Sequence, residues 1–182
     1  MQVEQLRLPE VILLTPRRFT DDRGWFSETY NQRVVDEALG STVRFVQDNH
    51  SRSAKGVLRG LHYQLPPHAQ GKLVRVLRGA VLDVAVDVRR SSPTFGQWVS
   101  AELTEANQAQ LWIPAGFAHG FLSLADGTEV LYKTTDFWAP AAERSIRWDD
   151  PALALPWPSD VVPRLASKDA AAPGLLGAEL FE

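Results

Sequence analysis

Hydrophobic and polar residues alternate along much of the chain with the period of two that is typical of β-strands. In residues 81–88 the even-numbered positions are all aliphatic and share one face, while Asp83 and Asp87 fall on the other. Residues 73–77 form a second apolar run just before this one, and Gly79 and Ala80 separate the two. Because a short glycine turn between two strands favours a hairpin, these runs are predicted to pair as neighbours.

Further short apolar runs, bounded by turn-forming residues, predict the other strands. They lie at residues 11–14, 96–103, 109–113, 120–124 and 130–135. One helix is predicted at residues 32–39, where Gly40 would end it. The tail from Pro151 is rich in Ala, Pro and Leu, and is predicted to be irregular with one short helix. Many short strands joined by turns predict an all-β, antiparallel sandwich or barrel of the jelly-roll type.

The composition is typical of a soluble globular protein and excludes several functional classes. With 45% hydrophobic and 23% charged residues, residues 1–182 are expected to form a single domain. The net charge of -3 provides no basic surface, so nucleic acid is not an expected partner. The absence of cysteine excludes disulfides, thiolate catalysis and cysteine-ligated metals. The N-terminus does not resemble a signal peptide, and no apolar run approaches the ~20 residues of a membrane helix, so a cytoplasmic location without membrane association is expected.

The most informative single residue is His62, within residues 60–72. This stretch resembles the metal-binding strand of a cupin from which the metal ligands are missing. A cupin metal site needs a closely spaced pair of histidines and a glutamate, whereas Gln64 stands two residues after His62. Lys72 lies further along the ligand region, and an ammonium has no lone pair to give to a metal. His62 is therefore predicted to transfer protons rather than to bind a metal.

Several stretches resemble, in order, the successive motifs of the dTDP-4-dehydrorhamnose 3,5-epimerase family. They are residues 19–28, 47–51, 56–64, 114–121, 132–133, 149–151 and 167–169. The series covers nearly the whole chain and is far more specific than any one motif. The resemblance implies a cupin-type jelly roll (a double-stranded β-helix) with a few short helices. It also implies a homodimer with exchanged N-terminal strands, and a reaction without metal or organic cofactor.

The reaction that the resemblance implies is epimerisation at C3 and C5 of dTDP-4-dehydro-6-deoxy-D-glucose, giving dTDP-4-dehydro-L-rhamnose for dTDP-L-rhamnose biosynthesis. Epimerisation beside a ketone needs a base, a stabiliser of the enolate oxygen and an acid on the opposite face. His62 suits the base, because an imidazole gains and loses its proton near neutral pH. The resemblance assigns the stabilising charge to Lys72 and the acid to Tyr132. It also implies that Asp169, which alone would be taken for a solvated tail residue, fixes the imidazole tautomer.

A second set of residues is expected to bind the nucleotide sugar. Arginine forks suit a diphosphate, which fits Arg23 and Arg59. Gln47 and Asn49 alternate along one strand face, so both can reach the same group. The resemblance implies that Trp138 stacks on the thymine ring. Further residues matched to substrate-contact positions are Phe26, Glu28, His119, Glu143 and Lys168.

Three alternative functions remain open from the sequence alone. Epimerases that invert only C3 or only C5 in other deoxysugar pathways share these motifs, and the pocket shape that decides between them cannot be read from the sequence. A non-catalytic sugar-nucleotide-binding cupin is disfavoured, because His62, Lys72 and Tyr132 occur together. A metal-dependent dioxygenase cupin is the least consistent, since the ligand set is missing.

Overall fold

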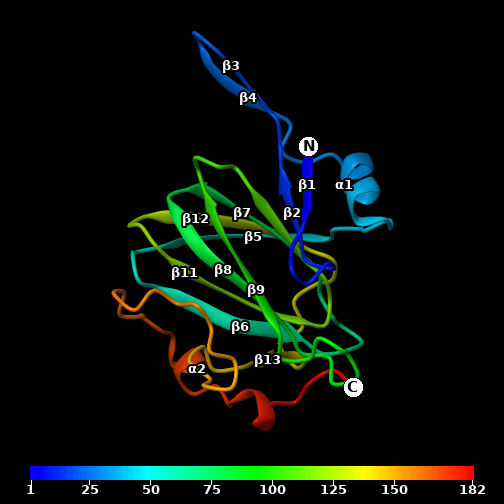
Figure 1. Cartoon of the computed structure of the whole chain (residues 1–182), viewed down its shortest axis with the longest axis vertical. Coiled ribbons are helices and arrows are strands. Elements are labelled where there is room, and N and C mark those ends of the chain that lie inside the picture. The colour runs from blue at the N-terminus through cyan, green and yellow to red at the C-terminus, as the bar shows by residue number, and fades with distance from the viewer.

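The computed structural model, which describes residues 1–182, contains two antiparallel β-sheets that face each other (Figure 1). The six-stranded sheet has the order β1 (Gln2–Gln5), β2 (Ile12–Thr15), β10 (Gln110–Ile113), β7 (Lys72–Arg78), β12 (Thr128–Thr134) and β5 (Gln47–Ser53). The five-stranded sheet has the order β13 (Glu143–Ser145), β6 (Leu58–Gln64), β11 (Phe117–Ser123), β8 (Ala80–Asp87) and β9 (Trp98–Thr104). This arrangement confirms the predicted all-β jelly roll of the cupin type.

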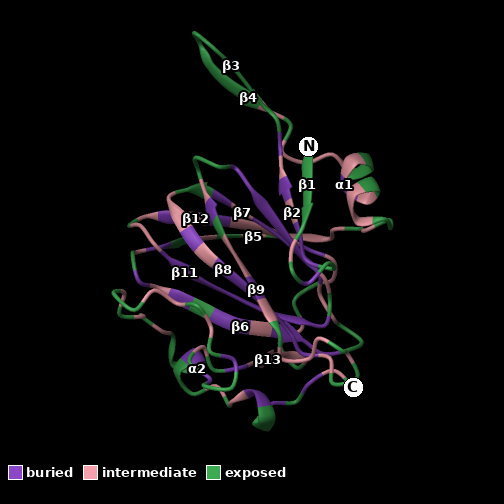
Figure 2. Cartoon of the chain, in the orientation of Figure 1, coloured by how far each residue is buried: buried purple, intermediate pink, exposed green.

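The main core lies between the two sheets. It includes Val74 from β7, Ala85 from β8 and Val130 from β12, all of them buried. A second buried cluster covers the other face of the five-stranded sheet, where residues of the C-terminal segment such as Ile146 and Leu180 pack on it. Figure 2 shows buried residues along the strands of both sheets. The five-stranded sheet is therefore covered on both faces.

The alternation predicted for residues 81–88 is present in β8, but its polar face is the inner one. Asp83 and Asp87 lie on the same side of the strand as the core residue Ala85 and are completely buried. The aliphatic face, which includes Val84, packs beneath the C-terminal segment instead. A pattern that usually marks a half-exposed strand belongs here to a strand that is buried on both faces.

The predicted hairpin between residues 73–77 and 81–88 is wrong. These runs form β7 and β8, which do not pair: β7 pairs with β10 and β12, and β8 with β9 and β11. The turn at Gly79 carries the chain from one sheet to the other, and its φ of +77° favours glycine. A Cβ there would lie 2.5 Å from Oγ1 of Thr128. Local alternation predicts strands but not the sheet to which each belongs.

The helix predicted at residues 32–39 is confirmed as α1 (Gln32–Leu39). The side chain of Asn31 caps its first turn by accepting a backbone hydrogen bond at 3.1 Å, and Gly40 ends it in the left-handed conformation. The short helix predicted in the C-terminal segment is α2 (Ser167–Ala170), and a 3-10 turn follows at Leu175–Gly177. No helix of the chain is long and apolar enough to span a bilayer.

The other predicted strands are present as β2, β9, β10, β11 and β12, with ends shifted by a few residues. The alternation did not predict β1, β13, or the hairpin of β3 (Arg18–Asp21) and β4 (Gly24–Ser27). This hairpin stands away from the barrel (Figure 1) and is exposed almost throughout (Figure 2). Its aromatic residues Phe19, Trp25 and Phe26 are each more than half exposed.

Candidate active site

A cavity of about 760 Å³ is lined by strands of both sheets and by the C-terminal segment. It brings together most of the residues that the sequence analysis selected. These are Gln47, Asn49, Arg59, His62, Lys72, His119, Tyr132, Trp138, Glu143, Lys168 and Asp169. Residues from β5, β7 and β12 line it from one sheet, and residues from β6, β11 and β13 from the other.

The imidazole of His62 forms a close pair with a carboxylate from the far end of the chain. Its Nε2 lies 2.6 Å from Oδ1 of Asp169, which is buried in α2. Burial alone would raise the pKa of Asp169, but the hydrogen bond and charge of His62, the backbone N–H of Gly60 and the charge of Lys168 together hold the pKa below its ordinary value. Because a carboxylate accepts the hydrogen bond, Nε2 carries the proton and Nδ1 keeps its lone pair. The pair thus has the geometry of an oriented base.

The ammonium of Lys72 is buried at the same cavity. Its side chain is 7% exposed, and Nζ donates a hydrogen bond to the backbone carbonyl of His62 at 3.1 Å. Burial lowers the pKa of Lys72 to about 8, against the opposing effect of the negative charges of Asp83 and Glu143. Such a cation can stabilise a negative charge that develops on a ligand in the cavity.

The phenol of Tyr132 lines the cavity from β12, in the sheet that faces His62. Burial raises the pKa of Tyr132; the positive charge of Arg59 opposes this rise and the negative charge of Glu143 adds to it. The phenol is therefore protonated at neutral pH and can act as a proton donor. His62 and Tyr132 thus line the cavity from facing sheets.

A second histidine, His119, lies directly opposite His62 in the pairing of β11 with β6. It is buried, and its Nε2 lies 3.0 Å from Oδ2 of Asp83.

Gln64 connects two loops: its amide donates to the carbonyl of His68 at 2.7 Å and its oxygen accepts from the backbone of Ala139 at 2.8 Å. No group of three or more His, Asp or Glu side chains is placed to hold a metal ion.

Four of the residues expected to bind the nucleotide line the cavity: Gln47, Asn49, Arg59 and Trp138. The side-chain amide of Gln47 donates to Asn49 at 3.0 Å, and its oxygen accepts from the backbone of Trp138 at 3.1 Å. The ring of Trp138 is 58% exposed. Arg59 bonds only to the hydroxyl of Ser53, at 3.3 Å, and has no carboxylate partner. The cavity therefore presents a free guanidinium and an open aromatic face.

Glu143 and Lys168, which both line the cavity, form an ion pair with Nζ 3.1 Å from Oε1. Three of the expected residues do not reach it. Arg23 pairs with Asp21 of its own hairpin, and Glu28 accepts a hydrogen bond from Asn31 at 3.2 Å. Phe26 lies on the exposed hairpin strand β4. Within one chain, the N-terminal hairpin does not contribute to the cavity.

The cavity also contains residues that the sequence analysis did not select. Ser51 continues the alternation of Gln47 and Asn49 along β5, so the strand pattern could have found it. Arg164 contributes another guanidinium without an ion-pair partner. It lies in the irregular C-terminal segment, where no periodic pattern indicates its direction. Others are Val57, Leu58, Tyr63, Gln64, Gln70, Phe121, Leu165 and Ala166.

The chain is similar over almost its full length to known epimerases. The family model described as dTDP-4-dehydrorhamnose 3,5-epimerase matches residues 5–176. A dTDP-4-dehydrorhamnose 3,5-epimerase from Pseudomonas aeruginosa is 59% identical over 181 residues, which are 100% of this chain and 99% of that protein. The dTDP-6-deoxy-D-glucose-3,5-epimerase of Legionella pneumophila, solved in complex with dTDP-4-keto-L-rhamnose, is 49% identical with a TM-score of 0.93, over 97% of this chain and 93% of that one. ChmJ, a 3'-monoepimerase from Streptomyces bikiniensis solved in complex with dTDP-quinovose, is 36% identical with a TM-score of 0.89, over 94% and 86%.

Proposed function

The chain belongs to the dTDP-4-dehydrorhamnose 3,5-epimerase family, and we propose that it converts dTDP-4-dehydro-6-deoxy-D-glucose to dTDP-4-dehydro-L-rhamnose by inverting C3 and C5. One observation carries the proposal. The oriented base His62 and the neutral phenol of Tyr132 line one cavity from facing sheets, and the buried ammonium of Lys72 lines it too. These are the three groups that inversion beside a ketone requires.

In the proposed reaction, Nδ1 of His62 removes the proton from the carbon beside the C4 ketone, while Nε2 stays bonded to Asp169. The electrons of the broken C–H bond move to the C4 oxygen and form an enolate, whose charge the ammonium of Lys72 stabilises. Tyr132 then gives its phenol proton to the opposite face of the same carbon, and the carbonyl re-forms. Exchange with solvent restores the neutral imidazole and the phenol. The same steps at the second carbon complete the reaction.

We propose that the diphosphate binds at Arg59 and that the thymine ring stacks on Trp138. The free guanidinium of Arg59 and the exposed ring of Trp138 support these assignments. Gln47 and Asn49 would bind polar groups of the nucleotide sugar from β5. Further proposed substrate contacts are His119, Glu143 and Lys168, which line the same cavity.

We also propose a homodimer in which the N-terminal hairpin completes the cavity of the partner molecule. The support is that Arg23, Phe26 and Glu28 lie away from the cavity of their own chain, on or beside a hairpin that projects into solvent (Figure 1). An exposed apolar patch next to an arginine is typical of an interaction surface. In the dimer, Arg23 would add a second cation at the diphosphate.

We further propose that residues 1–182 act as one domain in the cytoplasm. The family match, which runs from residue 5 to residue 176 without a break, supports a single domain. A chain without cysteine suits a reducing compartment.

The alternative function is inversion at a single centre. It is favoured by the likeness to ChmJ, whose name describes a 3'-monoepimerase and whose fold matches over 94% of this chain. Both reactions need the same base and acid, so the residues named above do not separate them.

Reaction in heavy water decides between these functions. Purified protein is incubated in D₂O with dTDP-4-dehydro-6-deoxy-D-glucose, and the sugar is analysed by mass spectrometry and proton NMR. We expect two carbon-bound deuteria, one at C3 and one at C5, together with inversion of both centres. One deuterium with one inversion would establish the single-centre reaction instead. No incorporation, in a protein that binds the substrate, would contradict catalysis.

A further inference from the structure

The barrel interior contains two imidazole–carboxylate pairs side by side, and the reaction proposed above uses only one of them. The pairing of β6 with β11 sets His62 opposite His119. His62 bonds to Asp169, and His119 bonds to Asp83 on the adjacent strand β8. Asp83 does not line the cavity and has no role in the steps described so far.

The carboxylate of Asp83 is completely buried and only partly satisfied. Nε2 of His119 lies 3.0 Å from both oxygens, but only Oδ2 has the geometry of a hydrogen bond, so Oδ1 has no donor. An ionised carboxylate in the interior is costly unless other positive charge compensates it. His119 alone provides one hydrogen bond. The position of Asp83 therefore indicates a further positive partner nearby.

The ammonium of Lys72 is a buried positive charge without a carboxylate in direct contact. Its only hydrogen bond goes to the backbone carbonyl of His62, and it forms no direct ion pair. Asp83 exerts the largest attraction on its charge and Glu143 the second largest. Glu143 already forms an ion pair with Lys168, at 3.1 Å, whereas Asp83 forms no ion pair with a lysine or an arginine. The titratable and charged groups that line the cavity around Lys72 are Arg59, His62, His119, Tyr132, Glu143, Lys168 and Asp169, with Arg164 near the C-terminal wall.

We propose that Asp83 is a positioning residue for the epimerisation, which orients the imidazole of His119 and keeps Lys72 in its charged form. The proposal rests on the proposed function insofar as Lys72 is the cation that stabilises the enolate. The negative charge of Asp83 opposes the lowering of the Lys72 pKa by burial. Without this charge the pKa of Lys72 would fall below about 8. A group with a lower pKa loses its proton at a lower pH, so the enolate would lose its cation within the working range.

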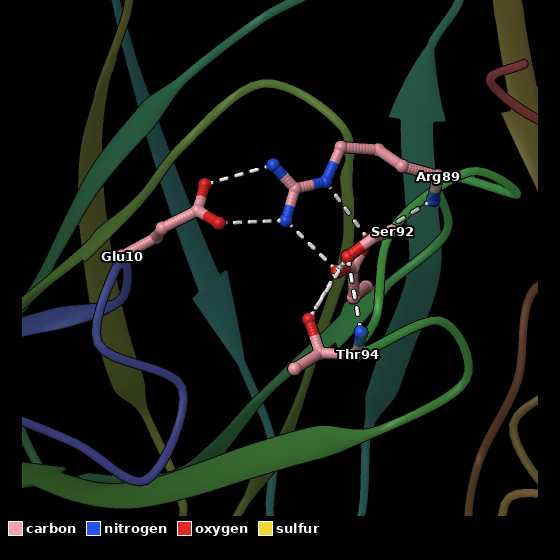
Figure 3. Close-up of polar contacts among 5 residues, drawn as sticks. Glu10, Arg89, Ser92 and Thr94 are labelled. Carbon is pink, nitrogen blue, oxygen red and sulfur yellow. Dashed lines mark hydrogen bonds and ion pairs between the residues drawn. The ribbon is translucent and has the colours of Figure 1, made fainter.

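The test compares Asp83→Asn with a matched control on the same strand. Asp87 is also completely buried in β8, but it lies outside the cavity and bonds to Arg89 at 2.8 Å and to Thr94 at 2.6 Å. Figure 3 shows this separate network, in which Arg89 also pairs with Glu10 at 2.8 Å. Asp87→Asn thus removes a buried carboxylate of the same kind without touching the surroundings of Lys72.

Two quantities are measured as a function of pH: kcat of the epimerisation, and the ¹³Cε resonance of Lys72 in protein labelled with [ε-¹³C]lysine. For Asp83→Asn we expect the Lys72 titration and the alkaline limb of kcat to move together by about one pH unit toward lower pH, with a loss of about tenfold in kcat above pH 8. KM should change by less than about threefold, because the amide oxygen of asparagine can still accept the hydrogen bond of His119 and keep its imidazole oriented. Asp87→Asn should lower the melting temperature and leave both titrations unchanged.

The proposal is overturned if, in Asp83→Asn, the alkaline limb of kcat and the Lys72 titration both stay at their wild-type pH. This holds whatever the loss of kcat. If Asp83→Asn fails to fold, the double variant Lys72→Met/Asp83→Asn decides. Removing both members of a coupled buried pair costs less than removing one. Recovery of cooperative unfolding supports the coupling, and continued failure to fold overturns it. Deuterium incorporation by the wild-type protein tests the proposed function separately, so the two ideas fail independently.

Discussion

In the proposed reaction each inversion moves two protons, and different side chains transfer them. His62 is held by Asp169 at 2.6 Å in one sheet, whereas Tyr132 belongs to the other. The reaction can therefore be divided experimentally into removal of a proton, which the base performs, and its return to the opposite face, which the acid performs.

Replacing Tyr132 with phenylalanine removes the acid and keeps the ring that packs against the core. The base can still form the enolate and return a solvent proton to the original face. We expect deuterium from D₂O to enter the recovered substrate, while the rate of inversion falls by ~10²–10⁴-fold. Mass spectrometry of the substrate and NMR of the product measure the two effects separately.

His62→Ala is the matched comparison, because without the base no enolate forms and both exchange and inversion should be lost. Near-native exchange in this variant would mean that another group removes the proton. Loss of exchange in Tyr132→Phe would mean that the phenol already acts in forming the enolate.

The residues of the cavity were predicted to very different degrees. His62 and Tyr132 were found because motif order points to them, although strand alternation alone would assign Tyr132 to packing. Asp83 could not be found in this way. A carboxylate on the polar face of an alternating strand is usually solvated, and only the tertiary fold reveals that this face points into the barrel. Arg164 gave no signal, because its segment has no regular period.

At the scale of the elements, β6 and β11 approach each other unusually closely next to the two histidines. Gly60 has a φ of +127°, and a Cβ there would lie 2.5 Å from Cα of Gly120 and 2.8 Å from the carbonyl oxygen of His119. The register of the pair also shifts between His119 and Phe121. The two glycines, Gly60 and Gly120, therefore allow β6, the strand of His62, to lie this close to β11.

Gly60→Ala should distort this contact as well as strain the backbone. We expect a cost of about 2–6 kcal/mol in the free energy of unfolding, the sum of about 1–3 for the strained φ and about 1–3 for overpacking. Because His62 lies two residues further along β6, kcat should fall as well. Urea unfolding and steady-state kinetics measure these effects.

Gly40→Ala serves as the control, since Gly40 also has a positive φ, +66°, but nothing lies within 4 Å of its Cβ position. It should show only the cost of backbone strain and keep its activity. Equal losses of stability in the two variants would show that the close approach of the strands contributes nothing to the destabilisation by Gly60→Ala.

The strands themselves were largely predictable, and their partners were not. Apolar runs located β2, β9, β10, β11 and β12, and Gly40 correctly marked the end of α1. The hairpin assigned to residues 73–77 and 81–88 failed, because Gly79 makes a crossing between sheets that looks locally like a hairpin turn. The hairpin of β3 and β4 lacks a buried face, so hydrophobic alternation could not indicate it.

At the scale of the whole molecule, the projecting hairpin of β3 and β4 leaves aromatic surface uncovered. Phe19, Trp25 and Phe26 are more than half exposed, and Arg18 lies 4.6 Å from the centre of the Trp25 ring. If two molecules exchange these hairpins, each cavity draws residues from both chains. Activity would then depend on association, and inactive variants could complement each other.

Mixing Arg23→Ala with His62→Ala tests this arrangement. Each homodimer carries one type of lesion in both of its sites. In a heterodimer one site receives both lesions and the other receives neither. After subunit exchange at equal amounts, we expect about a quarter of the wild-type activity, because half of the dimers have one intact site.

The control is Arg33→Ala in place of Arg23→Ala, because Arg33 lies on α1 rather than on the hairpin. Arg33→Ala should be active by itself, and mixing it with His62→Ala should give only the activity expected from the amount of Arg33→Ala chains. Absence of recovery in the first mixture, despite heterodimers detected by native mass spectrometry, would show that each site is built within one chain.

The pairing of His62 with Asp169 also has a consequence for synthesis. The two residues are separated by 107 positions, and every strand of the barrel lies before Asp169 in the chain. All the strands are therefore translated before Asp169, and folding can begin on the earlier part of the chain before this residue is added. A nascent chain that ends before α2 would lack the carboxylate proposed to orient His62, and also Leu175 and Leu180 of the buried cluster on the five-stranded sheet. The proposed active site can thus be completed only when the last part of the chain has been translated.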